Sequence, residues 1–84
     1  MNKKQHTLAE LKIGQSAIID SFTDEEMSLK LMEMGCMPGE KVTLQTIAPL
    51  GDPIAIFVSG YLLSMRKEEA STVVVFPHDQ GAIN

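Results

Sequence analysis

The chain has 84 residues, 44% of them hydrophobic and 21% charged, which is enough for one small core and too little for two. Seven Lys and Arg residues against eleven Asp and Glu residues give a net charge of −4, which argues against binding to DNA, RNA or anionic lipid. The single cysteine, Cys36, cannot form an internal disulfide and favours a cytoplasmic location. No apolar run approaches the ~20 residues of a spanning helix, so we expect no direct membrane insertion.

The first elements predicted along the chain are a short helical turn and a strand. Residues 1–6 are polar and are expected to form a loose leader. Thr7 and Glu10 have the spacing of a capping box, so a helical turn is predicted to begin there and to end at Gly14. The segment Ser16–Phe22 carries bulky apolar residues and is predicted to be the first strand.

One longer helix is predicted after this strand. Thr23 and Glu26 repeat the capping-box spacing, and Gly35 followed by Pro38 is a helix stop signal. Glu26 and Lys30 are spaced for an ion pair along the helix. Three apolar residues fall on one helical face and predict the side that packs on the core: Met27, Leu31 and Met34.

The rest of the chain predicts β structure. Ser59-Gly60 has the composition of a tight hairpin turn, and Arg66–Ala70 is expected to form one helical turn before a last strand and a frayed tail, 78–84. The alternation of apolar and polar residues predicts four further strands: Lys41–Ala48, Ile54–Ser59, Tyr61–Met65 and Thr72–Phe76.

Short antiparallel strands with one early helix fit neither a helical bundle nor a parallel α/β sheet. Such strands protect their edges by curling into a barrel. The predicted fold is therefore mainly β: a small SH3-like β-barrel of about five strands, with one α-helix inserted after the first strand and short helical turns. The chain is predicted to be a single domain, 1–84, with an ordered core of about 7–76.

The sequence lacks the grouped reactive residues that an enzyme needs. His6 and His78 lie near the expected flexible ends, where a general base would not be held in place. The adjacent acids Glu25-Glu26 and Glu68-Glu69 point in different directions on a helix and do not form a carboxylate pair. No phosphate-binding loop is present. We therefore predict no catalytic residues, no cofactor and no enzymatic activity.

A cluster of sulfur-containing residues raises the question of a metal site: Met27, Met32, Met34, Cys36 and Met37. Soft sulfur ligands would suit Cu(I) or an iron–sulfur group. Methionine also fills irregular gaps along a buried helix face, and a free cysteine behaves as a small apolar residue. We favour packing and predict no metal ligands, with a small metal carrier kept as an alternative.

Some apolar residues exceed what one small barrel can bury. If Ile54, Ile56 and Val58 point inward, Phe57 points outward, and Tyr61 and Leu63 share one face of the next strand. Exposed apolar surface of this kind often marks a partner site. Phe57 could instead cover the helix and complete a second core layer. The predicted partner interface consists of Leu29, Met32, Phe57, Tyr61 and Leu63.

Three segments together resemble the FeoA family, the ferrous iron transport protein A group. Residues 8–19 are similar to the family's opening, residues 31–42 to its central L-x-x-[LM]-G-x-x-P-G pattern, and residues 52–70 to its closing D-P-I and G-x-x-[LAS]-[LM]-R-x-x-E-A pattern. Cys36 and Met65 depart from the usual aliphatic residues but keep the apolar character.

The resemblance implies a cytoplasmic accessory protein that binds FeoB, a membrane Fe(II) transporter with a cytosolic G-protein region, and that supports or regulates Fe(II) uptake. Arg66, the sole arginine, is a candidate for contact with the nucleotide of that region, although tying its helical turn to the barrel is the favoured role. An SH3-like regulatory module of a metal-dependent repressor is an alternative function, and a weak homo-oligomer is a further partner hypothesis.

Overall fold

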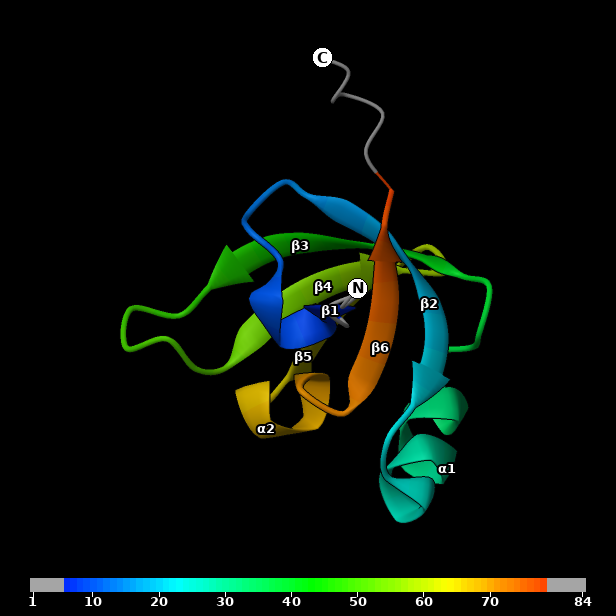
Figure 1. Ribbon diagram of the computed structural model, residues 1–84. Coiled ribbons are helices and arrows are strands. Elements are labelled where there is room, and N and C mark those ends of the chain that lie inside the picture. The colour runs from blue at the N-terminus through cyan, green and yellow to red at the C-terminus, as the bar shows by residue number, and fades with distance from the viewer. Residues whose placement is uncertain (1–5, 79–84) are drawn as a thin grey trace, which may run out of the picture.

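Figure 1 shows the computed structural model, which describes residues 6–78 as one antiparallel sheet curled around a core. The strand order in the sheet is β1-β6-β2-β3-β4-β5. In chain order the elements are β1 (His6–Thr7), the 3-10 helix η1 (Leu8–Glu10), β2 (Ser16–Phe22), α1 (Glu25–Glu33), β3 (Lys41–Ile47), β4 (Ile54–Val58), β5 (Tyr61–Met65), α2 (Lys67–Ala70) and β6 (Val73–Pro77).

The core is formed by the inward side of the curled sheet and by the residues that close its ends. Along β4, Ile54, Ile56 and Val58 are buried, whereas Phe57 is exposed, as the alternation in the sequence predicts. The other buried members of the core come from the remaining long strands, from the helices and from the segments that connect them: Leu8, Leu11, Ala17, Ile19, Leu31, Cys36, Val42, Leu44, Met65, Ala70, Val73 and Val75. The predicted mainly β architecture, with one helix after the first long strand, is confirmed.

Both ends of the described chain are tied to the sheet. His6 and Thr7 pair with Val75 and Val74 of β6, which adds a strand that the sequence did not predict. The backbone amide of His78 donates to the carbonyl oxygen of Ser16 at 2.8 Å. The expectation of loose segments at His6 and His78 is therefore wrong, while the rest of the predicted leader and tail lies outside the described residues.

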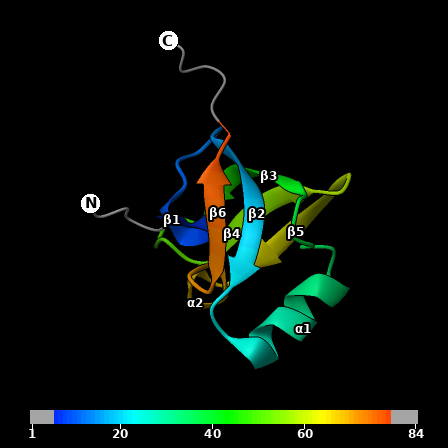
Figure 2. The ribbon, with the colours of Figure 1, turned by 45° about the vertical axis from the view of Figure 1, so that its right-hand side comes forward.

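Helix α1 begins at a cap one residue later than the sequence suggested. The amide of Met27 donates to Oδ1 of Asp24 at 3.0 Å, so Asp24 is the N-cap and not Thr23. The helix ends where Gly35 adopts φ 110°, a left-handed conformation that glycine takes without a steric penalty. In both ribbon views α1 projects from one end of the barrel, opposite the end where β6 finishes (Figures 1 and 2). No helix within residues 6–78 is long and apolar enough to cross a membrane.

The β4–β5 hairpin turns through two residues. Ser59 and Gly60 have φ values of 52° and 82°, the positive values that a tight primed turn requires. The turn fixes the register of the hairpin, since Val58 pairs with Tyr61 and Phe57 pairs with Leu62. The hairpin predicted at Ser59-Gly60 is confirmed.

Candidate partner interface

The outer face of the β4–β5 hairpin carries neighbouring exposed apolar side chains. Phe57 and Leu62 lie directly opposite each other in the antiparallel register, so their side chains stand on the same face. Their exposed fractions are 44% and 61%, and that of Tyr61 at the start of β5 is 67%. Tyr61 is opposite Val58 in the register, so its side chain leaves the strand on the other face, next to the turn. We call the three exposed residues Phe57, Tyr61 and Leu62 together the hairpin patch. Apolar side chains grouped in this way can be covered by a protein partner.

Helix α1 carries a second exposed apolar position. Leu29 is 64% exposed, and the half-buried Met32 lies three residues further along the helix, on a neighbouring position of its surface. Met32 also lines a shallow groove together with Phe22 and Pro38, where the end of β2 meets the helix. The polar residues of this groove include the acids Asp20 and Glu25. An apolar side chain with a basic neighbour would fit such a groove.

Two contacts join α1 and the turn that follows it to segments distant in sequence. The hydroxyl of Ser59, in the hairpin turn, donates to the carbonyl oxygen of Gly35 at 3.4 Å. Nζ of Lys30 donates to Oε2 of Glu69 at 2.7 Å, which joins the middle of α1 to α2. Lys30 therefore does not form the pair with Glu26 that the sequence suggested. The first contact joins the hairpin turn to the segment after α1, and the second joins α1 to α2.

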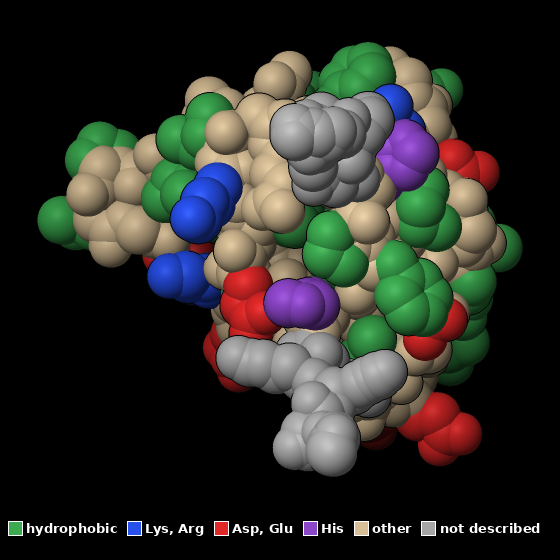
Figure 3. All heavy atoms as spheres, turned by 45° about the horizontal axis from the view of Figure 1, so that its top comes forward, with side chains coloured by type: hydrophobic (Ala, Val, Ile, Leu, Met, Phe, Trp, Pro, Cys, Tyr) green, Lys and Arg blue, Asp and Glu red, His purple; other side chains and the backbone are tan. Residues whose placement is uncertain are grey.

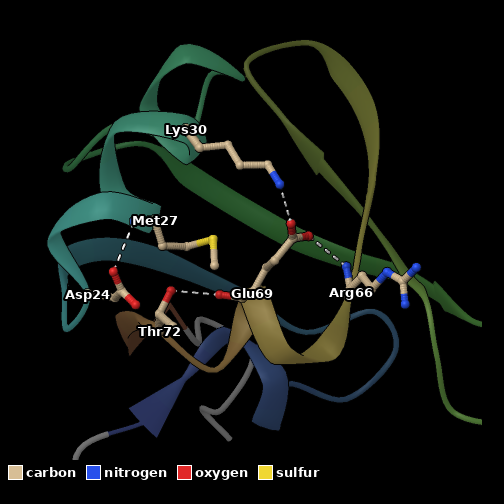
Figure 4. A network of polar contacts seen from close by, with 6 residues as sticks. All are labelled: Asp24, Met27, Lys30, Arg66, Glu69 and Thr72. Carbon is tan, nitrogen blue, oxygen red and sulfur yellow. Dashed lines mark hydrogen bonds and ion pairs between the residues drawn. The ribbon is translucent and has the colours of Figure 1, made fainter.

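Glu69 is the centre of the polar network shown in Figure 4. One carboxylate oxygen accepts from Lys30, and the other accepts from the backbone amide of Arg66 at 2.9 Å. The hydroxyl of Thr72 donates to the backbone carbonyl oxygen of Glu69 at 2.8 Å. The hydrogen bonds from Lys30 and from the Arg66 amide hold the pKa of Glu69 below its ordinary value. Glu69 thus stays ionised and fastens the start of α2 to α1.

The side chain of Arg66 is exposed and extends away from this network (Figure 4). Its backbone amide, and not its guanidinium group, is bonded to Glu69. No hydrogen bond or ion pair of the guanidinium group is found among residues 6–78. The bonds of the Arg66 backbone lie within its own turn, so the favoured prediction that Arg66 ties this turn to the barrel is not supported. The charged group is left available to a partner.

The sulfur-containing residues of and after α1 do not converge on one point of the surface. Met27 and Met34 pack against the core, and Cys36 is fully buried there, where burial raises the pKa of its thiol. Met37 is 45% exposed. Within the described chain, no three or more His, Cys, Asp or Glu side chains are grouped so that they could hold a metal ion. Packing accounts for the buried members of the cluster.

Three of the five residues predicted for the interface are exposed. Leu29, Phe57 and Tyr61 are exposed and Met32 is half-buried, whereas Leu63 is half-buried and packs against the core. The exposed leucine of β5 is its neighbour Leu62, which the sequence analysis missed. The signal was present, because a two-residue turn at Ser59-Gly60 pairs Phe57 with Leu62 and places both on the outer face.

Apolar side chains also reach the surface elsewhere. Figure 3 shows hydrophobic side chains among charged ones on the face that carries both histidines. Phe76 of β6 is 58% exposed, and Leu50 in the loop before β4 is 96% exposed. Exposure alone therefore does not single out the hairpin patch, and these other positions provide controls for any test of it.

Comparison with a family model assigns this chain to a protein family. The model of the FeoA domain matches residues 6–77, which is nearly the whole described chain. The chain belongs to the FeoA domain family. A curated FeoA relative, the Fe(2+) transport protein A/Fe(2+) transporter FeoB fusion protein of Porphyromonas gingivalis, is 33% identical over 69 residues. The match covers 81% of this chain and 8% of the fusion protein, so the chain corresponds to a small part of that relative.

Solved structures of FeoA proteins share the fold. The FeoA-like protein from Clostridium acetobutylicum is 32% identical, with a TM-score of 0.85 over 94% of this chain and 93% of that one. The zinc complex of FeoA from Stenotrophomonas maltophilia, described as an SH3 domain protein, is 32% identical, with a TM-score of 0.74 over 83% of this chain and 88% of that one. The predicted SH3-like fold and the resemblance to the FeoA family are confirmed.

A more distant likeness extends to a regulatory protein. A manganese-dependent transcriptional repressor has a TM-score of 0.78 over 90% of this chain and 38% of the repressor, at 13% identity. An identity this low shows the shared fold alone.

Proposed function

We propose that this chain is a cytoplasmic accessory protein of bacterial ferrous iron uptake that binds the soluble G-protein region of a FeoB-type transporter and supports or regulates Fe(II) transport. It does so as a binding module and catalyses no reaction of its own. The observation that carries the proposal is the relative in which a homologous FeoA segment and FeoB form one protein. Segments that are fused in one protein often act on each other as separate chains elsewhere.

The surface described above provides a means of binding. The hairpin patch and the exposed Leu29 of α1 offer apolar contacts at positions that the core does not use. The exposed guanidinium group of Arg66 lies next to the end of β5 and could add a charged contact. Interfaces commonly combine a few such apolar side chains with arginine. We assign the transporter contact to this surface.

Two substitutions test the assignment. Leu29→Glu and Tyr61→Ala are each expected to weaken binding to the detergent-solubilised FeoB-type transporter by about tenfold or more, because hot-spot residues contribute roughly 1–4 kcal/mol. Binding is measured by pull-down and by interferometry with the purified transporter, and Fe(II) uptake is measured in a deletion strain complemented with each variant.

Matched controls separate this surface from apolar exposure in general. Leu50→Glu adds the same charge as Leu29→Glu at an exposed loop position, and Phe76→Ala removes an exposed aromatic ring on another strand. Both controls are expected to retain binding, and all four variants should keep the thermal midpoint of the parent because exposed positions contribute little to the core. Normal Fe(II) uptake in the deletion strain, or equal binding by all four variants, would rule the proposal out.

A further inference from the structure

Strand β5 forms one edge of the sheet, and no strand of residues 6–78 lies on its outer side. It is the last strand in the order β1-β6-β2-β3-β4-β5, and its neighbour is β4. Figure 2 shows β5 at the margin of the sheet, with α1 projecting below it. Unpaired backbone groups along such an edge are a template for another strand.

The register identifies which backbone groups are unpaired. Val58 and Tyr61 flank the two-residue turn and exchange hydrogen bonds, so Ile56–Leu63 and Ile54–Met65 are the next bonded pairs. The amide and carbonyl groups of Leu62 and Ser64 therefore point away from β4. Among residues 6–78, these groups make no other hydrogen bond to backbone or side chain. Four backbone groups on β5 are open.

Strand β5 also lacks the features that usually protect an edge. Natural edge strands carry charges, proline or a bulge that discourages pairing. The sequence Tyr61-Leu62-Leu63-Ser64-Met65 has no charge and no proline, and its pairing with β4 runs without a register shift. Tyr61 and Leu62 are among the most exposed apolar residues of the described chain. This edge is suited to accept a strand.

We propose that β5 pairs with β5 of a second copy of this chain, antiparallel, about a two-fold axis at Leu63. This register places Leu62 opposite Ser64 of the second copy, and Ser64 opposite Leu62. All the open backbone groups of both strands are then bonded, since each such pair exchanges two hydrogen bonds. Tyr61 lies opposite Met65 of the second copy, and the five residues of each strand are matched in full.

The charges near β5 are compatible with a second copy of the chain. In the proposed register Arg66 lies beside Gly60 of the second copy, and Lys67 lies beside Ser59. No cation of one copy therefore faces a cation of the other along the strand. Each copy has a net charge of −4, but the paired strand itself carries no charge, so it adds no local repulsion.

The assembly closes at two copies. A two-fold contact uses the same surface on both partners, so both β5 edges are covered at once. In the part of the chain that the structure describes, the other edge of the sheet is β1, whose two residues offer little for a further strand. One short strand pair covers less area than the roughly 1,200–2,000 Å² of a stable interface, so the dimer is expected to be weak and concentration-dependent.

The test needs the purified chain alone. Sedimentation velocity from about 10 μM to about 1 mM is expected to show monomer converting to dimer and no larger species, as weak interfaces do. Amide exchange by NMR gives a residue-specific readout. The amides of Leu62 and Ser64 should exchange fast in dilute solution and become protected on concentration, whereas those of Tyr61, Leu63 and Met65 are protected throughout by β4.

Three variants assign the contact to β5. Ser64→Pro removes an outward amide without breaking a bond to β4, and Leu62→Lys adds charge to the edge; each should weaken association by at least about tenfold. Leu29→Glu on α1 should leave association unchanged. Because no transporter is present, the outcome does not depend on the proposed function. A chain that stays monomeric at the highest concentration, or that associates equally well with Ser64→Pro and Leu62→Lys, would overturn the proposal.

Discussion

Glu69 illustrates how one side chain can fasten two elements together. Its two carboxylate oxygens are used separately, one by Lys30 of α1 and one by the backbone amide at the start of α2. The Lys30 side chain is 58% exposed and the Glu69 side chain 15%, so the ion pair is partly screened by solvent. Glu69 therefore serves to position α1 as much as it adds to the free energy of folding.

Glu69→Gln is expected to lower the free energy of unfolding by about 0.5–1 kcal/mol near neutral pH. The amide oxygen of glutamine can still accept from Arg66, so the loss reports the charge facing Lys30. Urea denaturation measures the free energy of unfolding of Glu69→Gln. Glu68→Gln, at the exposed neighbouring position, is the control. Equal stability of the two variants would contradict this role of Glu69.

The same pair gives a pH dependence with a defined sign. The pKa of Glu69 is lower in the folded chain than in the unfolded one, where it is about 4.3. Its contribution is therefore complete above the unfolded value and disappears as pH falls through the folded value. The difference in stability between the parent and Glu69→Gln should be constant near pH 7 and shrink below about pH 4.

At the scale of elements, the start of α1 depends on Asp24. Asp24→Ala should destabilise the protein by about 1 kcal/mol, because the Met27 amide loses its acceptor. Thr23→Ala should cost less, since the Thr23 contact to Thr72 uses the backbone amide, which alanine retains. Circular dichroism during urea denaturation measures both changes. A larger effect of Thr23→Ala would show that the cap is misassigned.

The elements that the sequence predicted well are those with a strong local pattern. Alternation predicted β3 to β6, the bulky apolar residues of Ser16–Phe22 predicted β2, and the turn residues predicted the β4–β5 hairpin. The pattern could not predict β1, because a strand of two residues exists through its pairing with β6. It also placed the helix cap one residue early, because Thr23 and Asp24 are both good caps and their backbone geometry decides between them.

The candidate site was predictable to a similar degree. Exposure of Leu29 and Phe57 followed from periodicity, whereas Tyr61 is exposed although it shares a strand face with the core-packed Leu63. The choice between Leu62 and Leu63 required the register across the hairpin, which is a property of two strands and not of one. The partner of Lys30 lies 39 residues away in sequence, and no helical spacing rule could have indicated it.

At the scale of the whole molecule, stability comes from one core that the curled sheet encloses. Ile56→Ala is expected to cost about 2–5 kcal/mol, because a fully buried side chain leaves a cavity. Leu62→Ala, six residues away in the same hairpin, should change stability by less than about 0.5 kcal/mol in dilute solution. Chemical denaturation of both variants measures the contrast. Similar losses would place Leu62 in the core.

The arrangement of β6 and α1 has a practical consequence for any protein joined to this one. Strand β6 ends at the pole of the barrel remote from α1, where the amide of His78 donates to the carbonyl oxygen of Ser16. A dye or affinity handle placed at that pole leaves the helix free for docking. A short tether from the same pole would reach the flank of the barrel before it reached the helix, so linker length would select which surface a fused domain can touch.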